Sequence, residues 1–279
     1  MEIQKEKLSP MMQQYFALKE KYPDCVLFFR LGDFYEMFFD DAIRISRELE
    51  LTLTGRDCGL KERAPMCGIP YHSVDMYLKR LVERGYKIAI CEQLTDPATT
   101  KGLVERDVIR IVTPGTLIES NLLEEGANNY LCSLYFEDCG LCFADLSTGD
   151  IIALLPEQKN LEANVIDALS RYTPAEILMN EDALLLKSVM EFIKIRLQCV
   201  VTMRDAECFS AERNHDFVCH QFQVPELSYL QLPETGSETA AVYGMMDYIK
   251  ETQKNQIARF ISLTVNDDDA YLGLDFNAR

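Results

Sequence analysis

Short apolar segments alternate between strand-like and helix-like patterns along residues 1–115. Ser9 and Pro10 are typical of a helix start, and Pro23 predicts that the helix ends at about Tyr22. The unbroken apolar run at 25–29 indicates a strand that is buried on both faces. Similar reasoning predicts strands at 34–38, 51–54, 86–93 and 104–113, helices from Asp40 and from Ser73, and a polar loop at 55–64. These elements predict a compact mixed α/β domain.

The second part of the chain predicts three strands in a meander, followed by alternating helix and strand. The predicted strands are 130–136, 141–146, 151–155 and 175–179, and the predicted helices are 161–172, 183–193 and 239–253. This order is that of a ribonuclease-H-like fold. We therefore expect the following organisation: a first domain at 1–115, a linker at 116–128, a second domain at 129–255 and a further segment at 256–279.

The strand predicted at 34–38 places an aromatic ring and a carboxylate on one face. Gly32-Asp33 is a turn signal, and alternate residues of a strand share a face, so Phe34, Glu36 and Phe38 point the same way. Residues two apart along a strand are separated by roughly 6.5 Å. One interpretation is an apolar wedge beside a carboxylate near a turn. Because aromatic strand residues are usually buried, the pattern alone favours a core Phe34 and a solvated Glu36.

Charge is distributed unevenly along the 279 residues. The net charge of −17 argues against nucleic-acid binding by the chain as a whole. Residues 1–115 contain 17 Lys and Arg against 18 Asp and Glu, whereas residues 116–279 contain 11 against 27. The first part can therefore present a local basic surface, and the second part is expected to repel phosphate.

The overall composition, 48% hydrophobic and 26% charged, is typical of a globular protein. No apolar run approaches the roughly 18 residues needed to span a bilayer, and the first residues lack a signal-peptide pattern. We therefore expect a cytoplasmic protein without membrane association, whose ten cysteines are reduced thiols. Cys139 and Cys142 form a lone CxxC, which without a second ligand pair does not indicate zinc.

A metal-dependent nuclease is an alternative function for the second domain, because a ribonuclease-H-like nuclease needs carboxylates clustered around divalent metal. Asp145 lies at a predicted strand end, with Asp138, Asp150 and Asp167 nearby in sequence. Their spacing forms no defined motif, so solvated turn carboxylates are the simpler interpretation.

Gly-Lys, which a P-loop requires, and GxGxxG are both absent from the sequence, so no nucleotide-binding loop is predicted.

Residues 30–41 closely resemble a motif in the N-terminal part of the bacterial MutS family of DNA mismatch-recognition proteins. The resemblance is dense at 11–116, thinner through Gln253, and returns at 271–279. It includes further motifs in the family's order, at residues 68–72, 90–93, 96–99, 110–116 and 145–149. Several separate motifs in one order make the match specific.

The resemblance implies a mismatch-recognition domain with a mixed sheet, followed by a ribonuclease-H-like connector domain and the start of a helical core domain. It implies that Phe34 enters the minor groove as a wedge and stacks on the mispaired base, to which Glu36 hydrogen-bonds. Arg56 and Arg106 match positions expected to contact the DNA backbone. The connector domain is expected to engage a MutL-like protein.

The resemblance also implies that the chain is the N-terminal piece of a homodimeric ATPase, whose ATP and magnesium are bound far downstream. The piece itself is then expected to have no catalytic activity, cofactor or metal, and to bind mismatched double-stranded DNA weakly or not at all. Phe34 with Glu36 places the chain among the family members that read mismatches. The remaining alternative is an interaction module, in which the acidic second domain docks a repair partner and the first domain is only structural.

Overall fold

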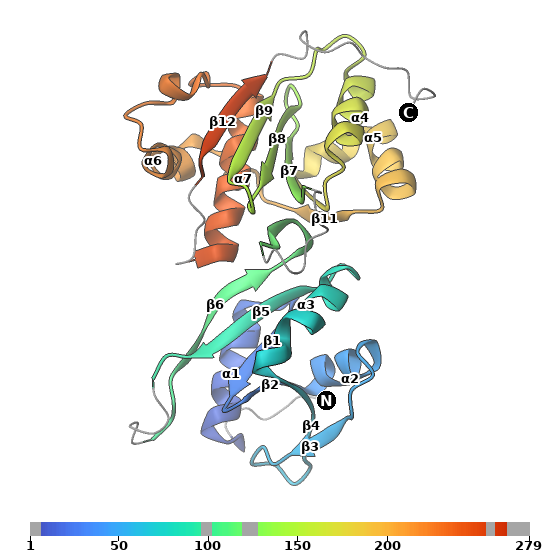
Figure 1. Cartoon of the computed structure of the whole chain (residues 1–279), viewed down its shortest axis with the longest axis vertical. Helices are drawn as coiled ribbons and strands as arrows, with labels where there is room; N and C mark the ends of the chain where they lie inside the picture. Colours follow the sequence, from blue (N-terminus) through green and yellow to red (C-terminus); the bar gives the residue numbers. More distant parts are fainter. Residues whose placement is uncertain (1–6, 96–101, 119–127, 255–259, 267–279) are drawn as a thin grey trace. The chain divides into compact units, whose positions relative to one another are not determined.

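The chain folds into two compact units, with the main division between Thr113 and Pro114 (Figure 1). Each unit contains a six-stranded mixed sheet with helices packed on it, which confirms the predicted α/β class. The structure, a computed structural model, describes residues 7–95, 102–118, 128–254 and 260–266.

The sheet of the first unit has the strand order β3-β4-β2-β1-β5-β6. β1 and β5 run parallel, and the other neighbouring strands are antiparallel. The strands are β1 (Cys25–Leu31), β2 (Phe34–Phe38), β3 (Thr54–Arg56), β4 (Ala64–Pro70), β5 (Lys87–Gln93) and β6 (Arg106–Val112). β2 is therefore an interior strand, and the short turn that joins it to β1 lies at one rim of the sheet.

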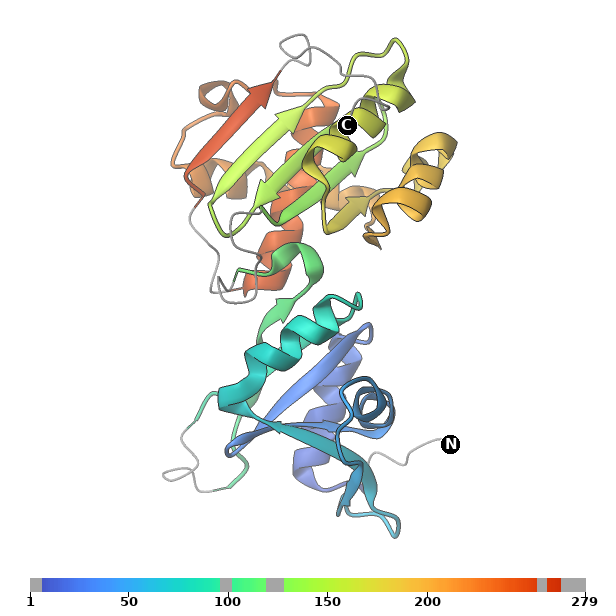
Figure 2. The ribbon, with the colours of Figure 1, turned by 45° about the vertical axis from the view of Figure 1, so that its right-hand side comes forward.

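Helices pack on both faces of this sheet. The helices are α1 (Pro10–Lys21), α2 (Phe39–Glu48) and α3 (Val74–Val82). α1 begins at its proline, as predicted, and contributes Tyr15 to a core in which its ring meets the rings of Phe29 and Phe38 edge-on. α3 crosses the opposite face of the sheet (Figure 2). The last residue of β2, Phe38, is therefore buried in the aromatic core beneath α1.

The sheet of the second unit has the strand order β11-β10-β7-β8-β9-β12. β7, β8 and β9 form an antiparallel meander, and β10 and β11 then add in parallel at the β7 edge. The strands are β7 (Tyr130–Tyr135), β8 (Gly140–Asp145), β9 (Asp150–Leu154), β10 (Glu176–Met179), β11 (Val200–Met203) and β12 (Ser262–Asn266). This arrangement confirms the predicted ribonuclease-H-like order.

Two hydrophobic cores lie on the two faces of this second sheet. Neighbouring residues of β7 alternate between them: Leu131 packs with the residues of α6 and α7, and Cys132 with those of α4 and α5. The helices are α4 (Leu161–Tyr172), α5 (Lys187–Phe192), α6 (Ala211–Phe222) and α7 (Ser237–Gln253). Among the helices of the described ranges, none is long and apolar enough to cross a membrane.

Several segments differ from the sequence prediction. Of the strand predicted at 51–54, only Thr54 lies in a strand, β3, and the polar loop predicted at 55–64 is wrong at its two ends, where Gly55 and Arg56 belong to β3 and Ala64 begins β4. The sequence prediction also lacks β4, β11 and α6. β12 pairs in parallel with β9, so the second sheet continues into the segment 256–279 that the sequence assigned to a helical core domain. Residues 256–259 and 267–279 of that segment lie outside the described residues.

Candidate functional site

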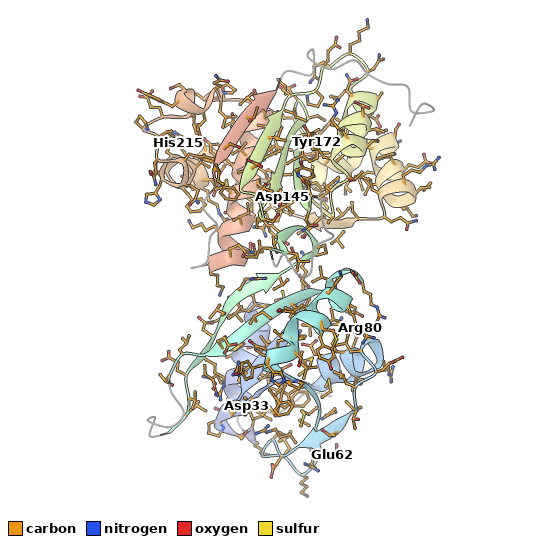
Figure 3. The ribbon with its side chains drawn as sticks, in the orientation of Figure 1. Asp33, Glu62, Arg80, Asp145, Tyr172 and His215 are labelled. Carbon is orange, nitrogen blue, oxygen red and sulfur yellow. The ribbon has the colours of Figure 1, made fainter. Side chains whose placement is uncertain are left out.

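The hairpin of β1 and β2 places Phe34 at the rim of the first sheet. Its turn is Gly32-Asp33, with Asp33 labelled in Figure 3, and Leu31 pairs with Phe34 across it. Gly32 has a φ of +57°, a left-handed conformation that glycine adopts without strain. Phe34 is 46% exposed, whereas Phe38 on the same face is fully buried. Phe34 is therefore not a core residue, although aromatic residues of strands usually are.

Glu36 lies two residues further along β2, and its carboxylate is paired with Arg56. The distance from Arg56 Nη1 to Glu36 Oε2 is 2.5 Å, and the side chains are 39% and 13% exposed respectively. The residue of β4 opposite Glu36 is Gly68, which has no side chain to block the approach of the guanidinium from β3. The structure thus joins Glu36 and Arg56 on the face where Phe34 is exposed.

Arg106 occupies a different environment and is only 8% exposed. Its Nε donates to Arg30 O at 2.8 Å, and its Nη1 donates to Val104 O at 2.9 Å and to Gln14 Oε1 at 3.1 Å. Its guanidinium carbon lies 5.1 Å from the centre of the Phe29 ring. Burial lowers the pKa of Arg106 from its ordinary value. These contacts tie α1 and the end of β1 to the start of β6.

A second set of side chains surrounds the same turn. The guanidinium carbon of Arg30 lies 3.7 Å from the centre of the Tyr71 ring and 5.5 Å from that of Tyr35. Arg30 Nη1 lies 3.5 Å from Glu92 Oε1, and the Tyr35 hydroxyl donates to the same oxygen. Burial raises the pKa of Tyr35, and the hydrogen bond to Glu92 adds to this effect.

Sequence reasoning did not connect Arg30, Tyr71 and Glu92, because they come from three separate segments with no common spacing. The only signal was indirect. Each residue lies in one of the motifs at 30–41, 68–72 and 90–93 that carry the family resemblance.

Two of the carboxylates considered for a nuclease site, Asp145 and Asp150, accept hydrogen bonds within the second unit. Asp145, labelled in Figure 3, is 1% exposed and accepts hydrogen bonds from Ser147 N at 2.9 Å, Ser147 Oγ at 2.6 Å and Asn129 N at 3.2 Å. Asp150 accepts from Ser262 Oγ at 2.9 Å. Over the part of the chain that the structure describes, no three His, Cys, Asp or Glu side chains are arranged to hold a metal ion.

The ten cysteines are all free thiols. Cys139 and Cys142 of the CxxC are both fully buried. Burial raises the pKa of Cys139 to about 11, so this thiol is protonated at neutral pH. A protonated, buried thiol is neither a ready metal ligand nor a nucleophile.

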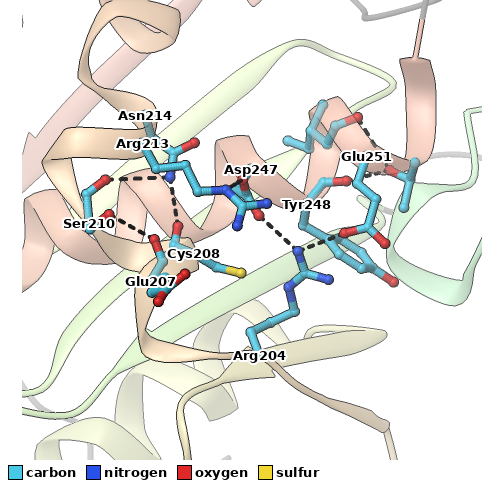
Figure 4. Close-up of polar contacts among 11 residues, drawn as sticks. Arg204, Glu207, Cys208, Ser210, Arg213, Asn214, Asp247, Tyr248 and Glu251 are labelled. Carbon is cyan, nitrogen blue, oxygen red and sulfur yellow. Dashed lines mark hydrogen bonds and ion pairs between the residues drawn. The ribbon is translucent and has the colours of Figure 1, made fainter.

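A charged cluster of the second unit, drawn in Figure 4, has a structural role. Asp247, 4% exposed, accepts from Arg204 Nη2 at 2.8 Å and from Arg213 Nε at 2.7 Å. Arg204 Nη2 also lies 2.7 Å from Glu251 Oε2. Against the effect of burial, the Glu251 carboxylate raises the pKa of Arg204. Because these charges satisfy one another, the cluster fixes α6 and the segment after β11 against α7.

The fold and the site together define a class of two-domain protein. Its first domain has a mixed sheet and exposes an aromatic ring at the rim of a hairpin, and its second domain is ribonuclease-H-like. Comparison with family models agrees with this division. The model of MutS domain I matches residues 9–121, and that of MutS domain II matches residues 129–260. The chain belongs to the MutS family.

Its relatives include three clostridial proteins, each named DNA mismatch repair protein MutS. The chain is 48% identical over 276 residues to that of Clostridium tetani, covering 98% of this chain and 30% of that protein. It is 46% identical over 275 residues to that of Clostridium botulinum and 44% identical over 274 residues to that of Clostridium novyi, covering 28% and 29% of those proteins and 98% of this chain in each case. The chain therefore spans about 30% of the length of the curated relatives it matches.

Proposed function

We propose that this chain recognises mismatched base pairs in double-stranded DNA, as part of DNA mismatch repair. The relatives are named DNA mismatch repair proteins, which supports a role of this chain in mismatch repair. The single observation that carries the proposal is Phe34, an aromatic ring 46% exposed at the rim of a sheet and two residues from a carboxylate. β2 is paired on both sides, so the ring stands on a strand that is held in place.

An exposed ring on a fixed strand suits insertion between base pairs from the minor groove. Opening a base step costs a few kcal/mol, and the cost is lower where base pairing is already damaged. A wedge of this kind therefore senses how easily the DNA deforms, rather than its sequence. Phe34 would stack on the mispaired base, which is the most easily displaced one.

Glu36 and Arg56 supply opposite charges beside the wedge. A bare carboxylate near phosphates is unfavourable, and the 2.5 Å ion pair with Arg56 neutralises Glu36 in the free protein. At a mispaired base, Glu36 accepts a hydrogen bond from a base N–H, and Arg56 turns to a phosphate. An undistorted duplex does not offer that N–H, so the carboxylate opposes its binding.

Arg106 enters the proposal as a positioning residue. The backbone contact that the resemblance implied for it would fall to Nη2, because Nε and Nη1 already donate to three acceptors within the protein. Since the residue is 8% exposed and holds the carbonyl of Arg30, we assign it the role of fixing the end of β1.

For the second domain we propose docking of a MutL-like protein. Residues 116–279 carry 11 basic and 27 acidic residues, a balance that suits a basic protein surface better than phosphate. We assign binding, and no catalytic step, to both domains. The homodimer and the ATP and magnesium chemistry implied for the whole protein stay predictions.

The proposal is tested by comparing wild type with Phe34→Ala in the full-length protein, on a G·T duplex and a fully paired duplex at fixed salt. Stacking of a base on an aromatic side chain contributes about 1–3 kcal/mol, so we expect G·T affinity to fall by about tenfold or more. Affinity for paired duplex should change by less than about twofold.

Met76→Ala is the matched control, because Met76 is an exposed apolar side chain of the same domain, 58% exposed on α3. It should leave both affinities unchanged. Equal G·T affinities for wild type and Phe34→Ala would contradict the proposal.

A further inference from the structure

The Gly32-Asp33 turn that presents Phe34 is held by a stack of side chains from four strands and loops. Arg30, two residues before Gly32, lies over the Tyr71 ring, with its guanidinium carbon 3.7 Å from the ring centre. The Tyr35 ring and the Glu92 carboxylate complete its surroundings. Only 17% of the Arg30 side chain is exposed.

Hydrogen bonds connect this stack to the backbone of the turn. Arg30 Nε donates to Gly32 O at 2.5 Å, which holds the first residue of the turn. Tyr71 N donates to Asp33 O at 2.9 Å, which ties the other side to the end of β4. Arg106 Nε in turn holds Arg30 O at 2.8 Å. The two backbone carbonyls of the turn are thus each held by a residue of the stack.

Such fixation matters because the turn contains a glycine, whose backbone has more freedom than that of any other residue. A mobile turn would have to be ordered each time Phe34 entered a base step, at a cost in binding free energy. A planar guanidinium suits this position, since it stacks on a ring and donates in the plane at the same time. The ammonium of lysine is not planar, so it cannot cover the ring and donate to Gly32 O in this way at the same time.

We propose that Arg30, clamped by Tyr71 and Glu92, is a positioning residue that preorganises the Gly32-Asp33 turn and so sets the mismatch selectivity of Phe34. The proposal rests on the proposed function of Phe34 as a wedge. It gives a common role to the three motifs at 30–41, 68–72 and 90–93, which the DNA contacts alone do not explain.

The competing role for Arg30 is direct contact with a phosphate. One face of its guanidinium is occupied by Tyr71, its Nε by Gly32 O, and its Nη1 faces Glu92. The two roles predict different results. A phosphate contact contributes to any duplex and to the salt dependence, whereas a positioning residue contributes only where Phe34 does.

The test measures G·T and paired-duplex affinities of the full-length protein for Arg30→Met, Arg30→Lys, Phe34→Ala and the double variant Arg30→Met/Phe34→Ala. We expect both Arg30 variants to reduce the G·T-to-paired affinity ratio by about tenfold, and paired-duplex affinity to stay within about twofold. The double variant should match Phe34→Ala alone, because Arg30 acts through the wedge. Arg84→Met, which removes an Arg 45% exposed on the same domain, is the control for lost charge.

A readout without DNA separates the inference from the proposed function. Hydrogen exchange of the Tyr71 amide, the donor to Asp33 O, should become at least about tenfold faster in Arg30→Lys, while amides of β1 stay protected.

Unchanged exchange at Tyr71 would overturn the positioning role, whatever the DNA results. Equal losses on both duplexes in Arg30→Met, with wild-type behaviour of Arg30→Lys, would overturn it in favour of a phosphate contact. If Phe34→Ala leaves the affinity ratio unchanged, the proposed wedge fails and the selectivity role of Arg30 fails with it. Faster exchange would then show only that Arg30 orders the turn.

Discussion

At the scale of single residues, the proposed contact of a carboxylate with DNA depends on the Glu36–Arg56 ion pair. Arg56 Nη1 lies 2.5 Å from Glu36 Oε2, but the two side chains differ in exposure: Glu36 is 13% exposed and Arg56 is 39% exposed. The cation is therefore the member that a phosphate can reach. In the proposed complex with a mismatch, Glu36 gains a base N–H and Arg56 gains a phosphate in place of each other. In the proposed complex with a paired duplex, the carboxylate would be left without a hydrogen-bond donor.

Replacing Glu36 by Gln should therefore weaken discrimination by strengthening the wrong complex. The amide removes the repulsion from phosphates and releases Arg56, so we expect affinity for fully paired duplex to rise by about three- to tenfold. Affinity for G·T should change less. Fluorescence anisotropy with the two duplexes at fixed salt measures both values.

Glu48→Gln is the matched control, since Glu48 forms an ion pair of 2.5 Å with Arg84 elsewhere on the same domain. It loses the same charge away from the wedge. A rise in paired-duplex affinity of equal size in both variants would show a general charge effect and contradict the role of Glu36.

At the scale of elements, the segment between β3 and β4 is closely packed on the start of α1. Ser9 N donates to Cys58 O at 2.9 Å. Gly59 has a φ of +89°, and a Cβ built there would lie 2.8 Å from Lys7 O and 2.9 Å from Ser9 N. The contact requires a residue without a side chain.

We therefore expect Gly59→Ala to destabilise the first domain by about 2–4 kcal/mol, from backbone strain together with steric overlap. Gly32→Ala is the matched comparison, since Gly32 also has a positive φ but nothing lies within 4 Å of its Cβ position. It should cost only about 1 kcal/mol. Calorimetry should show a much larger fall in Tm for Gly59→Ala, and equal falls would contradict the packing argument.

The elements that the sequence predicted well are those with strong local signals. Pro10 marks the first residue of α1, and the apolar run of β1 is buried throughout its first five residues. β4 was missed because Pro65, Gly68 and Pro70 disfavour a strand. It forms because β2 and β3 pair with it on both sides, which is tertiary information that no local pattern contains.

At the scale of the whole molecule, the exposure of Phe34 also lay beyond the sequence pattern. Phe34 and Phe38 have the same residue type and share a strand face, yet one is 46% exposed and the other fully buried. The difference arises because β2 starts at the rim and ends under the aromatic core of α1. The family resemblance directed attention to Phe34, and the ion pair of Glu36 with Arg56 and the Arg30 stack required the folded structure.

The most direct test of the wedge measures whether the base beside a G·T mismatch becomes unstacked. The reporter is 2-aminopurine at that position, whose fluorescence is measured with the DNA fully bound. Wild type should raise the fluorescence on the G·T duplex, since Phe34 opens the step and unstacks the reporter. Phe34→Ala, at concentrations that saturate the DNA, should leave the fluorescence near that of free duplex. An equal rise with Phe34→Ala would show that another group opens the step and would contradict the account.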